Sequence, residues 1–234
     1  TLYVNGVLMC QITDNDAKAR KGGIIALQIH KGPPMKLQFR NIVLKDIKLE
    51  ADLIAVLKSN AEHKEKADAC RKLARLGTAD AVPTLAAMLA DKKLSHMARY
   101  ALEPIDSPTV DDALRNALGK LKGLRLVGVI GSIGRRHDEK AIVALTAMLK
   151  DADTAVAQAA VRALGNIGTE KASKALEKTL KRAEATKRLV VYEGLLQCAK
   201  TLSAKGTRDR ALAIYDSLRN MPKAPHQVRA GALR

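Results

Sequence analysis

The fold of this chain is decided by the stretch Val156–Gly168, which reads VAQAAVRALGNIG. Apolar side chains recur in it at helical spacing, so it predicts an amphipathic helix that ends at a glycine. Its alanines are small enough to let a neighbouring helix approach closely. The ending Leu164-x-x-Ile167-Gly168 is the part that returns elsewhere in the chain.

Related endings occur at three earlier places: Leu73-x-x-Leu76-Gly77, Leu102-x-x-Ile105-Asp106 and Ile130-x-x-Ile133-Gly134. Successive copies are separated by 29, 28 and 34 residues. Self-similarity at such a period is typical of solenoids, in which each unit buries its apolar face only against its neighbours. We therefore expect a mostly α fold, an α-α superhelix.

The composition agrees with closely packed helices. The chain has 234 residues, enough for one large domain or two modest ones. Ala and Leu dominate its apolar residues, while Trp is absent and Phe occurs once, which disfavours a binding face of stacked aromatic rings. The net charge of +17 means that an acidic partner must be considered, although charge bears on association and solubility rather than on fold.

The three cysteines, Cys10, Cys70 and Cys198, are scattered and odd in number, so neither a disulfide framework nor a zinc spacing follows. Cys70 and Cys198 lie on predicted helices, where we expect them to be small buried apolar residues. The five histidines are dispersed, so we expect no metal and no cofactor. No apolar run approaches the length of a membrane span.

Residues 49–234 are predicted to form helix pairs. The pattern places a first helix at Leu49–Ser59, and the five pairs that follow are Ala61–Leu76 with Asp80–Ala90, Leu94–Leu102 with Pro108–Leu121, Leu124–Ile133 with Glu139–Lys150, Thr154–Ile167 with Glu170–Ala183, and Thr186–Ala204 with Arg208–Asn220. A further helix begins at His226 and is cut at Arg234. An incomplete last repeat would expose an apolar face, so we expect a frayed C-terminus.

Capping residues support this division. Good N-cap residues precede the second helix of each pair, namely Thr78 or Asp80, Ser107, Asp138, Thr169 and Thr207. Glycines stand where a preceding helix must turn away, at Gly77, Gly134, Gly168 and Gly206. With a repeat of about 30 residues and such endings, the region resembles HEAT repeats, most closely the short bacterial kind related to phycobilisome-lyase repeats. That resemblance implies a contact surface for a partner protein or a neighbouring domain.

Residues 1–48 follow a different pattern, that of antiparallel strands. Thr1–Val4 and Val7–Ile12 flank Asn5-Gly6, which is a strong hairpin signal because both turn residues tolerate positive φ. Ile24–His30 and Met35–Leu44 alternate as strands. Four strands in 48 residues are too few for a stable sheet domain. We expect them to be the small antiparallel end of a jelly-roll sandwich whose other strands lie upstream.

Three motifs in order carry a second resemblance: Val4-Asn5-Gly6-Val7, then Gly23–His30 with the sequence GIIALQIH, then Phe39-Arg40-Asn41-Ile42. They resemble the C-terminal end of the 3-keto-disaccharide hydrolase family, which is similar to concanavalin-like lectins and glucanases. The resemblance implies a domain that acts on or binds glycosides, in a parent protein that is exported and bacterial. It suggests a periplasmic or extracellular location.

The candidate substrate-binding residues of this β piece are Gln28, His30, Arg40 and Asn41. Gln28 and His30 share one face of a strand, and both can donate and accept hydrogen bonds to sugar hydroxyls. Alternatively, His30 and Arg40 satisfy backbone groups at the sheet margin. No carboxylate pair for glycoside chemistry is visible, so catalytic residues are unknown and would lie upstream.

Two features of the helical region allow a second interpretation. Gly128-x-x-Gly131-x-x-Gly134, followed by Arg135-Arg136, superficially resembles the glycine loop of KH modules, but its spacing on one helix favours close helix contact. The charge of the region has two interpretations. Basic pairs such as Arg135-Arg136, Lys181-Arg182 and Lys187-Arg188 could follow a phosphate backbone, but aromatic residues for stacking are few.

The preferred hypothesis is a fragment of a multidomain protein. In it, residues 1–48 end a glycoside-acting domain, and residues 49–234 form a HEAT-repeat interaction scaffold. The parent would be a hydrolase of glycosidic bonds, and this fragment itself would be inactive. Two alternatives stay open. One is a non-catalytic module that binds glycans or proteins, and the other is a basic solenoid that binds nucleic acid, which we consider the weaker of the two.

Overall fold

The computed structural model describes residues 2–4, 7–10, 47–221 and 224–233. The chain divides into two compact units, Thr1–Val43 and Leu44–Arg234. The first unit contains two short strands, β1 (Leu2–Val4) and β2 (Val7–Cys10), which pair antiparallel with Tyr3 opposite Leu8 and Val4 opposite Val7. The predicted turn Asn5-Gly6 and the two later strands lie outside the described residues. One strand pair does not establish a jelly-roll sandwich, which stays a prediction.

The second unit is helical. Its α-helices are α1 (Ile47–Lys58), α2 (His63–Leu76), α3 (Val82–Ala87), α4 (Ser95–Leu102), α5 (Pro108–Leu118), α6 (Gly123–Arg135), α7 (Ile142–Met148), α8 (Thr154–Ile167), α9 (Glu170–Arg182), α10 (Ala185–Ala204), α11 (Arg208–Arg219) and α12 (His226–Gly231). Short 3-10 turns precede and follow α3 at Ala79–Ala81 and Met88–Ala90, and one precedes α7 at Glu139–Ala141. The predicted pairs are therefore present, with shorter second helices in two of them.

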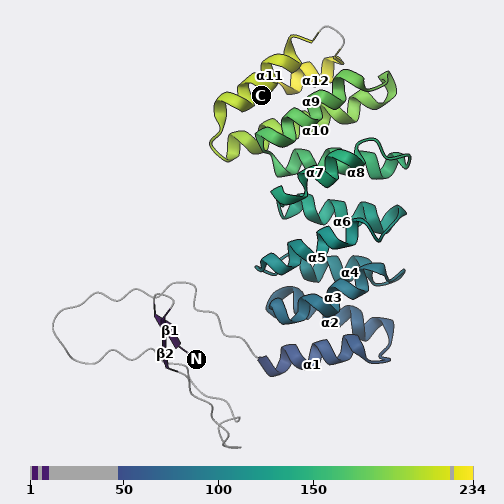
Figure 1. The fold of residues 1–234 in the computed structure, drawn as a ribbon, viewed down its shortest axis with the longest axis vertical. Helices are drawn as coiled ribbons and strands as arrows, with labels where there is room; N and C mark the ends of the chain where they lie inside the picture. Colours follow the sequence, from purple (N-terminus) through teal and green to yellow (C-terminus); the bar gives the residue numbers. More distant parts are fainter. Residues whose placement is uncertain (1, 5–6, 11–46, 222–223, 234) are drawn as a thin grey trace, which may run out of the picture. The chain divides into compact units, whose positions relative to one another are not determined.

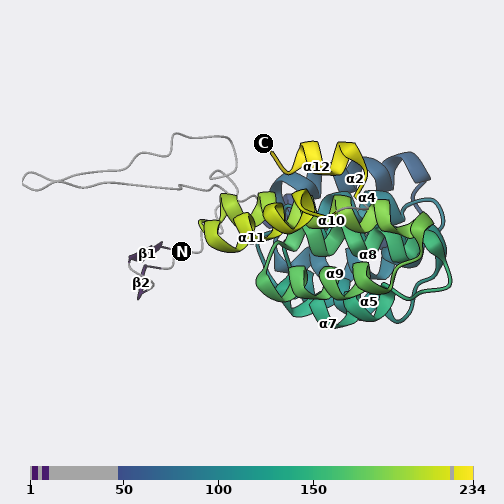
Figure 2. The same ribbon diagram turned by 90° about the horizontal axis from the view of Figure 1, so that it is seen from above.

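Successive pairs stack along one direction from α1 to α11 (Figure 1). The first helices of the pairs contact one another, α2 with α4, α4 with α6, α6 with α8 and α8 with α10, while second helices pack as α3 on α5 and α7 on α9. Viewed along the stack, α2 and α4 lie toward one side and α5 and α7 toward the other (Figure 2). This two-layered arrangement is the predicted helical solenoid.

The repeated endings supply the core of the stack. Leu73, Leu102, Ile130 and Leu164 are all fully buried. Each copy of the motif therefore packs one helix pair against its neighbour. In the stretch Val156–Gly168, all alanine, valine, leucine and isoleucine side chains are buried except that of Ala157, which is half-buried. Burial of apolar area of this kind is the main driving force for folding.

The predicted N-caps are mostly confirmed. The side-chain oxygens of Thr78, Ser107, Asp138 and Thr169 each accept a hydrogen bond from a backbone N–H in the following turn. Thr207 makes no such bond, so its capping role was wrongly predicted. Its φ and ψ of −87° and 62° lie outside the extended conformation that an N-cap usually adopts.

Three of the four predicted glycine stops are confirmed, because Gly77 follows α2, Gly168 follows α8, and Gly206 with φ of 86° follows the end of α10. Gly168 ends α8 with φ of 58°, the left-handed conformation that favours glycine. Gly134 instead lies inside α6, and the positive φ after that helix belongs to His137. A Cβ on Gly134 would lie 2.8 Å from the Cα of Ala163, so this glycine is required for the close approach of α6 and α8.

Candidate functional site

The four residues predicted to bind a substrate, Gln28, His30, Arg40 and Asn41, lie outside the described residues. Their role therefore stays a prediction.

The two cysteines on the helices are buried, as the sequence predicts. Cys70 and Cys198 are fully inaccessible, and burial raises the pKa of each thiol from 9.0 to about 11. A thiol with such a pKa is almost entirely protonated at neutral pH and is a poor nucleophile. Among the described residues, no group of three or more His, Cys, Asp or Glu side chains could hold a metal ion, and no helix could span a membrane.

The glycine series on α6 combines three different environments. Gly134 makes the predicted close helix contact, whereas Gly131 has open space where a Cβ would be. Gly128 makes room for the side chain of Arg99, whose guanidinium would lie 2.6 Å from an added Cβ. Arg99 donates to the Gly128 carbonyl at 3.3 Å, and burial lowers the pKa of its guanidinium. The expectation of helix contact thus holds for one of the three glycines.

The basic pair Arg135-Arg136 serves the fold rather than an outside ligand. Arg135 pairs with Glu103. Arg136 donates to Asp111 at 2.5 Å and to the backbone carbonyls of Glu103 and Ile105 at 2.7 and 2.9 Å. Its guanidinium therefore holds the turn between α4 and α5 against the end of α6. The suggestion that this pair could follow a phosphate backbone is not supported by this geometry.

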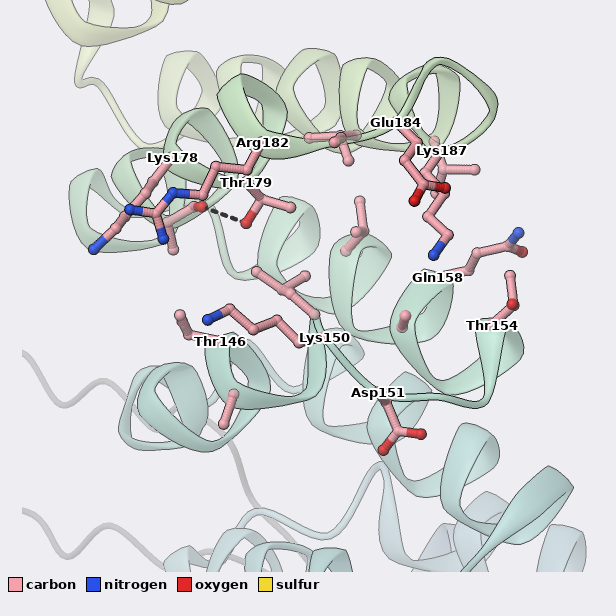
Figure 3. Close-up of a pocket in the computed structure, with 18 of the residues that line it drawn as sticks. Thr146, Lys150, Asp151, Thr154, Gln158, Lys178, Thr179, Arg182, Glu184 and Lys187 are labelled. Atoms are coloured by element: carbon pink, nitrogen blue, oxygen red, sulfur yellow. Dashed lines mark hydrogen bonds between the residues drawn. The ribbon is translucent and has the colours of Figure 1, made fainter.

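The second unit contains a groove of about 1010 Å³. It is formed by α7, the turn that follows it, α8, α9 and the start of α10, and we call it the α7–α10 groove (Figure 3). Its floor is apolar: Val161 and Val191 are buried, and Leu149 and Val190 are half-buried. An apolar side chain placed there would lose its contact with water, which is favourable.

The rim of the α7–α10 groove is mainly cationic. Four exposed basic side chains line it, Lys150, Lys178, Arg182 and Lys187. None of the four makes a side-chain hydrogen bond or an ion pair to any described residue. Two carboxylates, Asp151 and Glu184, complete the rim. The groove can therefore offer an apolar surface beside four cations that have no side-chain partner in the part of the chain that the structure describes.

A second hollow of about 580 Å³ lies between α9, α10 and α11. Two of its three cations, Arg188 and Arg210, already have partners within the fold. Arg210 donates to Ser173 Oγ at 2.8 Å and to Glu177 at 2.7 Å, and Arg188 donates to the Ala183 carbonyl at 3.0 Å. Because its principal cations are engaged, this hollow is a weaker candidate than the α7–α10 groove.

The sequence named two basic pairs here without separating their members. Of Lys181-Arg182, the structure places Arg182 on the α7–α10 groove and Lys181 on the second hollow. Of Lys187-Arg188, it places Lys187 on the groove and Arg188 on the second hollow. Neighbouring residues on a helix face different directions, which is the one signal that could have separated them. The groove itself was not predicted.

Comparison with known proteins supports the repeat architecture. Residues 124–195 match the HEAT_2 family, HEAT repeats. No curated protein matches the sequence. Nothing in these comparisons supports a 3-keto-disaccharide hydrolase domain, so the glycoside-acting role and the glycan ligand stay predictions.

Comparison with solved structures gives matches of low identity and low TM-score. An engineered protein from the Northeast Structural Genomics Consortium is 19% identical with a TM-score of 0.46, over 79% of this chain and 56% of its own. The chain thus spans little more than half of that protein. A second engineered protein from the same consortium is 18% identical with a TM-score of 0.45, over 80% of this chain and 94% of its own. Human deoxyhypusine hydroxylase in complex with glycerol is 15% identical with a TM-score of 0.43, over 80% of this chain and 84% of its own.

Proposed function

We propose that the helical unit is an interaction scaffold that holds a segment of a partner protein in the α7–α10 groove. The observation that carries this proposal is the groove itself, in which an apolar floor lies beside cations that the fold leaves unpaired. A peptide segment matches such a surface because it can present apolar and charged side chains together. HEAT repeats at residues 124–195 include α8, α9 and the first part of α10, which supply much of the groove, and repeat scaffolds commonly bind partners along extended surfaces.

The groove is also of suitable size. Its volume of about 1010 Å³ lies at the upper end of the range typical of small-molecule pockets, which is roughly 300 to 1000 Å³. It is open along the helices rather than enclosed, as Figure 3 shows for the space between Lys150 and the overlying α9. A segment of several residues could therefore enter it from the surface.

The test is selection of a random peptide library on the immobilised full chain, followed by affinity measurements on a matched pair of variants. Ala147 and Ala144 are both exposed on α7, but only Ala147 lines the groove. Ala147→Trp should fill the groove and abolish binding of the selected peptides. Ala144→Trp adds the same side chain outside the groove and should leave binding intact.

Two outcomes would overturn the scaffold proposal. The selection could give no peptide whose binding depends on the groove. The two variants could also weaken binding equally, which would place the contact surface elsewhere on the molecule. Circular dichroism of both variants checks that each retains the helical fold.

A further inference from the structure

The two ends of the α7–α10 groove differ in charge. At one end, Lys178 and Arg182 lie one turn apart on α9, and Lys150 extends below them from the turn after α7 (Figure 3). The two carboxylates of the rim, Asp151 and Glu184, lie away from this end in the same view. Three like charges without a compensating carboxylate repel one another, so an anion bound among them would be stabilised.

The other end of the groove is mixed in character. Lys187 and Glu184 lie together there, above Gln158 and Thr154 (Figure 3). The apolar floor of Leu149, Val161, Val190 and Val191 belongs to the same groove. The groove thus combines a cluster of three cations, an apolar floor and a polar end of low net charge.

From this combination we infer that the occupant is an acidic peptide segment in which a cluster of Asp or Glu residues adjoins one or two apolar residues. The carboxylates of the peptide bind Lys150, Lys178 and Arg182, and its apolar side chains contact the apolar floor of the groove. Arg182 can hold a carboxylate by two parallel hydrogen bonds, whereas the lysines act as compact point charges. This inference rests on the proposed scaffold function and adds the chemistry of the partner.

A peptide fits the groove better than a nucleic acid does. The lining contains no aromatic side chain, whereas proteins that bind single strands usually stack bases on aromatic rings. A phosphate backbone that followed the groove beyond its cationic end would also approach the carboxylate of Asp151 or Glu184. The helical unit as a whole agrees with an acidic partner, since residues 49–234 carry 33 basic and 21 acidic side chains, a balance of +12.

The experiment measures fluorescence anisotropy of labelled peptides with the full chain. Three peptides of equal length share the same two leucines and carry a flanking cluster of Glu, Gln or Lys. Each peptide is made in two versions, with the cluster before or after the leucines, because the groove does not fix the direction in which the peptide runs. We expect the Glu peptide to bind about tenfold more tightly than the Gln peptide in one of the two orders, the Lys peptide to bind more weakly still, and the preference to shrink as salt screens the charges.

A matched pair of charge variants locates the effect. Lys150→Gln, Lys178→Gln and Arg182→Gln together should weaken the Glu peptide about tenfold, since each exposed pair contributes a few-fold. The control triple, Lys120→Gln, Lys140→Gln and Lys171→Gln, removes the same net charge from exposed positions outside the groove and should change affinity less than about twofold.

The outcomes separate this inference from the scaffold proposal. Equal affinity for the Glu and Gln peptides overturns the inference without any variant, and so does equal weakening by the two triples. If the library selection still gives neutral peptides whose binding is lost in Ala147→Trp, the scaffold proposal survives alone. Tighter binding of a single-stranded oligonucleotide than of the Glu peptide, lost in the groove triple, would assign the groove to nucleic acid and overturn both.

Discussion

At the scale of single residues, α6 contains two glycines three positions apart whose surroundings are opposite. A Cβ on Gly134 would lie 2.8 Å from the Cα of Ala163, whereas a Cβ on Gly131 would have nothing within 4 Å. Gly134→Ala should therefore cost about 1–3 kcal/mol of unfolding free energy through overpacking. Gly131→Ala should instead stabilise by about 0.5–1 kcal/mol, because alanine has the higher helix propensity. Urea denaturation followed by circular dichroism measures both, and changes of the same sign would contradict this account.

The adjacent arginines after α6 provide a second matched pair. Arg136 is largely buried and donates to three backbone carbonyls and to Asp111, so Arg136→Ala should cost about 2–3 kcal/mol. Arg135 is more than half exposed and pairs only with Glu103, so Arg135→Ala should cost at most about 1 kcal/mol. Thermal unfolding of the two variants gives the comparison. Similar losses would mean that Arg136 does not hold the turn between α4 and α5.

The buried thiols predict a dependence of stability on alkaline pH. In the folded state, burial raises the pKa of Cys70 and Cys198 from 9.0 to about 11, so the unfolded chain loses these protons first. The contribution is fully present below pH 9 and is lost as the pH rises through about 11. The double variant Cys70→Ala, Cys198→Ala should lose less unfolding free energy between these pH values than the parent does. Parallel curves for the two proteins would show that the thiols do not titrate as described.

At the scale of elements, two of the three threonines that precede second helices differ in what they do. Thr169 Oγ1 accepts from the Ala172 N–H at 3.2 Å at the start of α9, whereas Thr207 makes no side-chain cap at the start of α11. Thr169→Ala should cost about 1 kcal/mol, and Thr207→Ala close to nothing. Guanidinium denaturation distinguishes the two. A loss in Thr207→Ala as large as that in Thr169→Ala would restore the uniform capping that the sequence suggests.

The contrast between Thr169 and Thr207 shows which part of helix capping can be predicted from the sequence. The residue type at a helix start is local information, so Thr78, Ser107, Asp138 and Thr169 were identified correctly. Whether the side chain then bonds depends on the backbone angles at that residue, which the neighbouring helix pair sets. Gly134 was misplaced for a similar reason, because glycine at a motif end can serve either a turn or a close helix contact.

At the scale of the whole molecule, the helical unit was predictable because its contacts are local. Each repeated ending, such as Leu164-x-x-Ile167, packs on the preceding and following pairs, so a period in the sequence translates directly into a stack. The α7–α10 groove was not predictable in this way. It depends on the space left between α7 and α9 and on which member of each basic pair faces that space, and neither follows from the period. The four candidate residues of the β piece remain untested predictions.

Local contacts also predict how the stack loses stability. In a solenoid, stability is close to a sum of repeat and nearest-neighbour terms, so damage at one junction should spread little. Gly134→Ala strains the junction of α6 and α8. Hydrogen exchange should therefore accelerate most in α6 through α9 and much less in α2. Gly131→Ala, on the same helix but away from the junction, should leave the pattern unchanged. An equal acceleration from α2 to α11 would show instead that the helical unit opens as one cooperative body, because a weakened junction can then lower protection everywhere only through global unfolding.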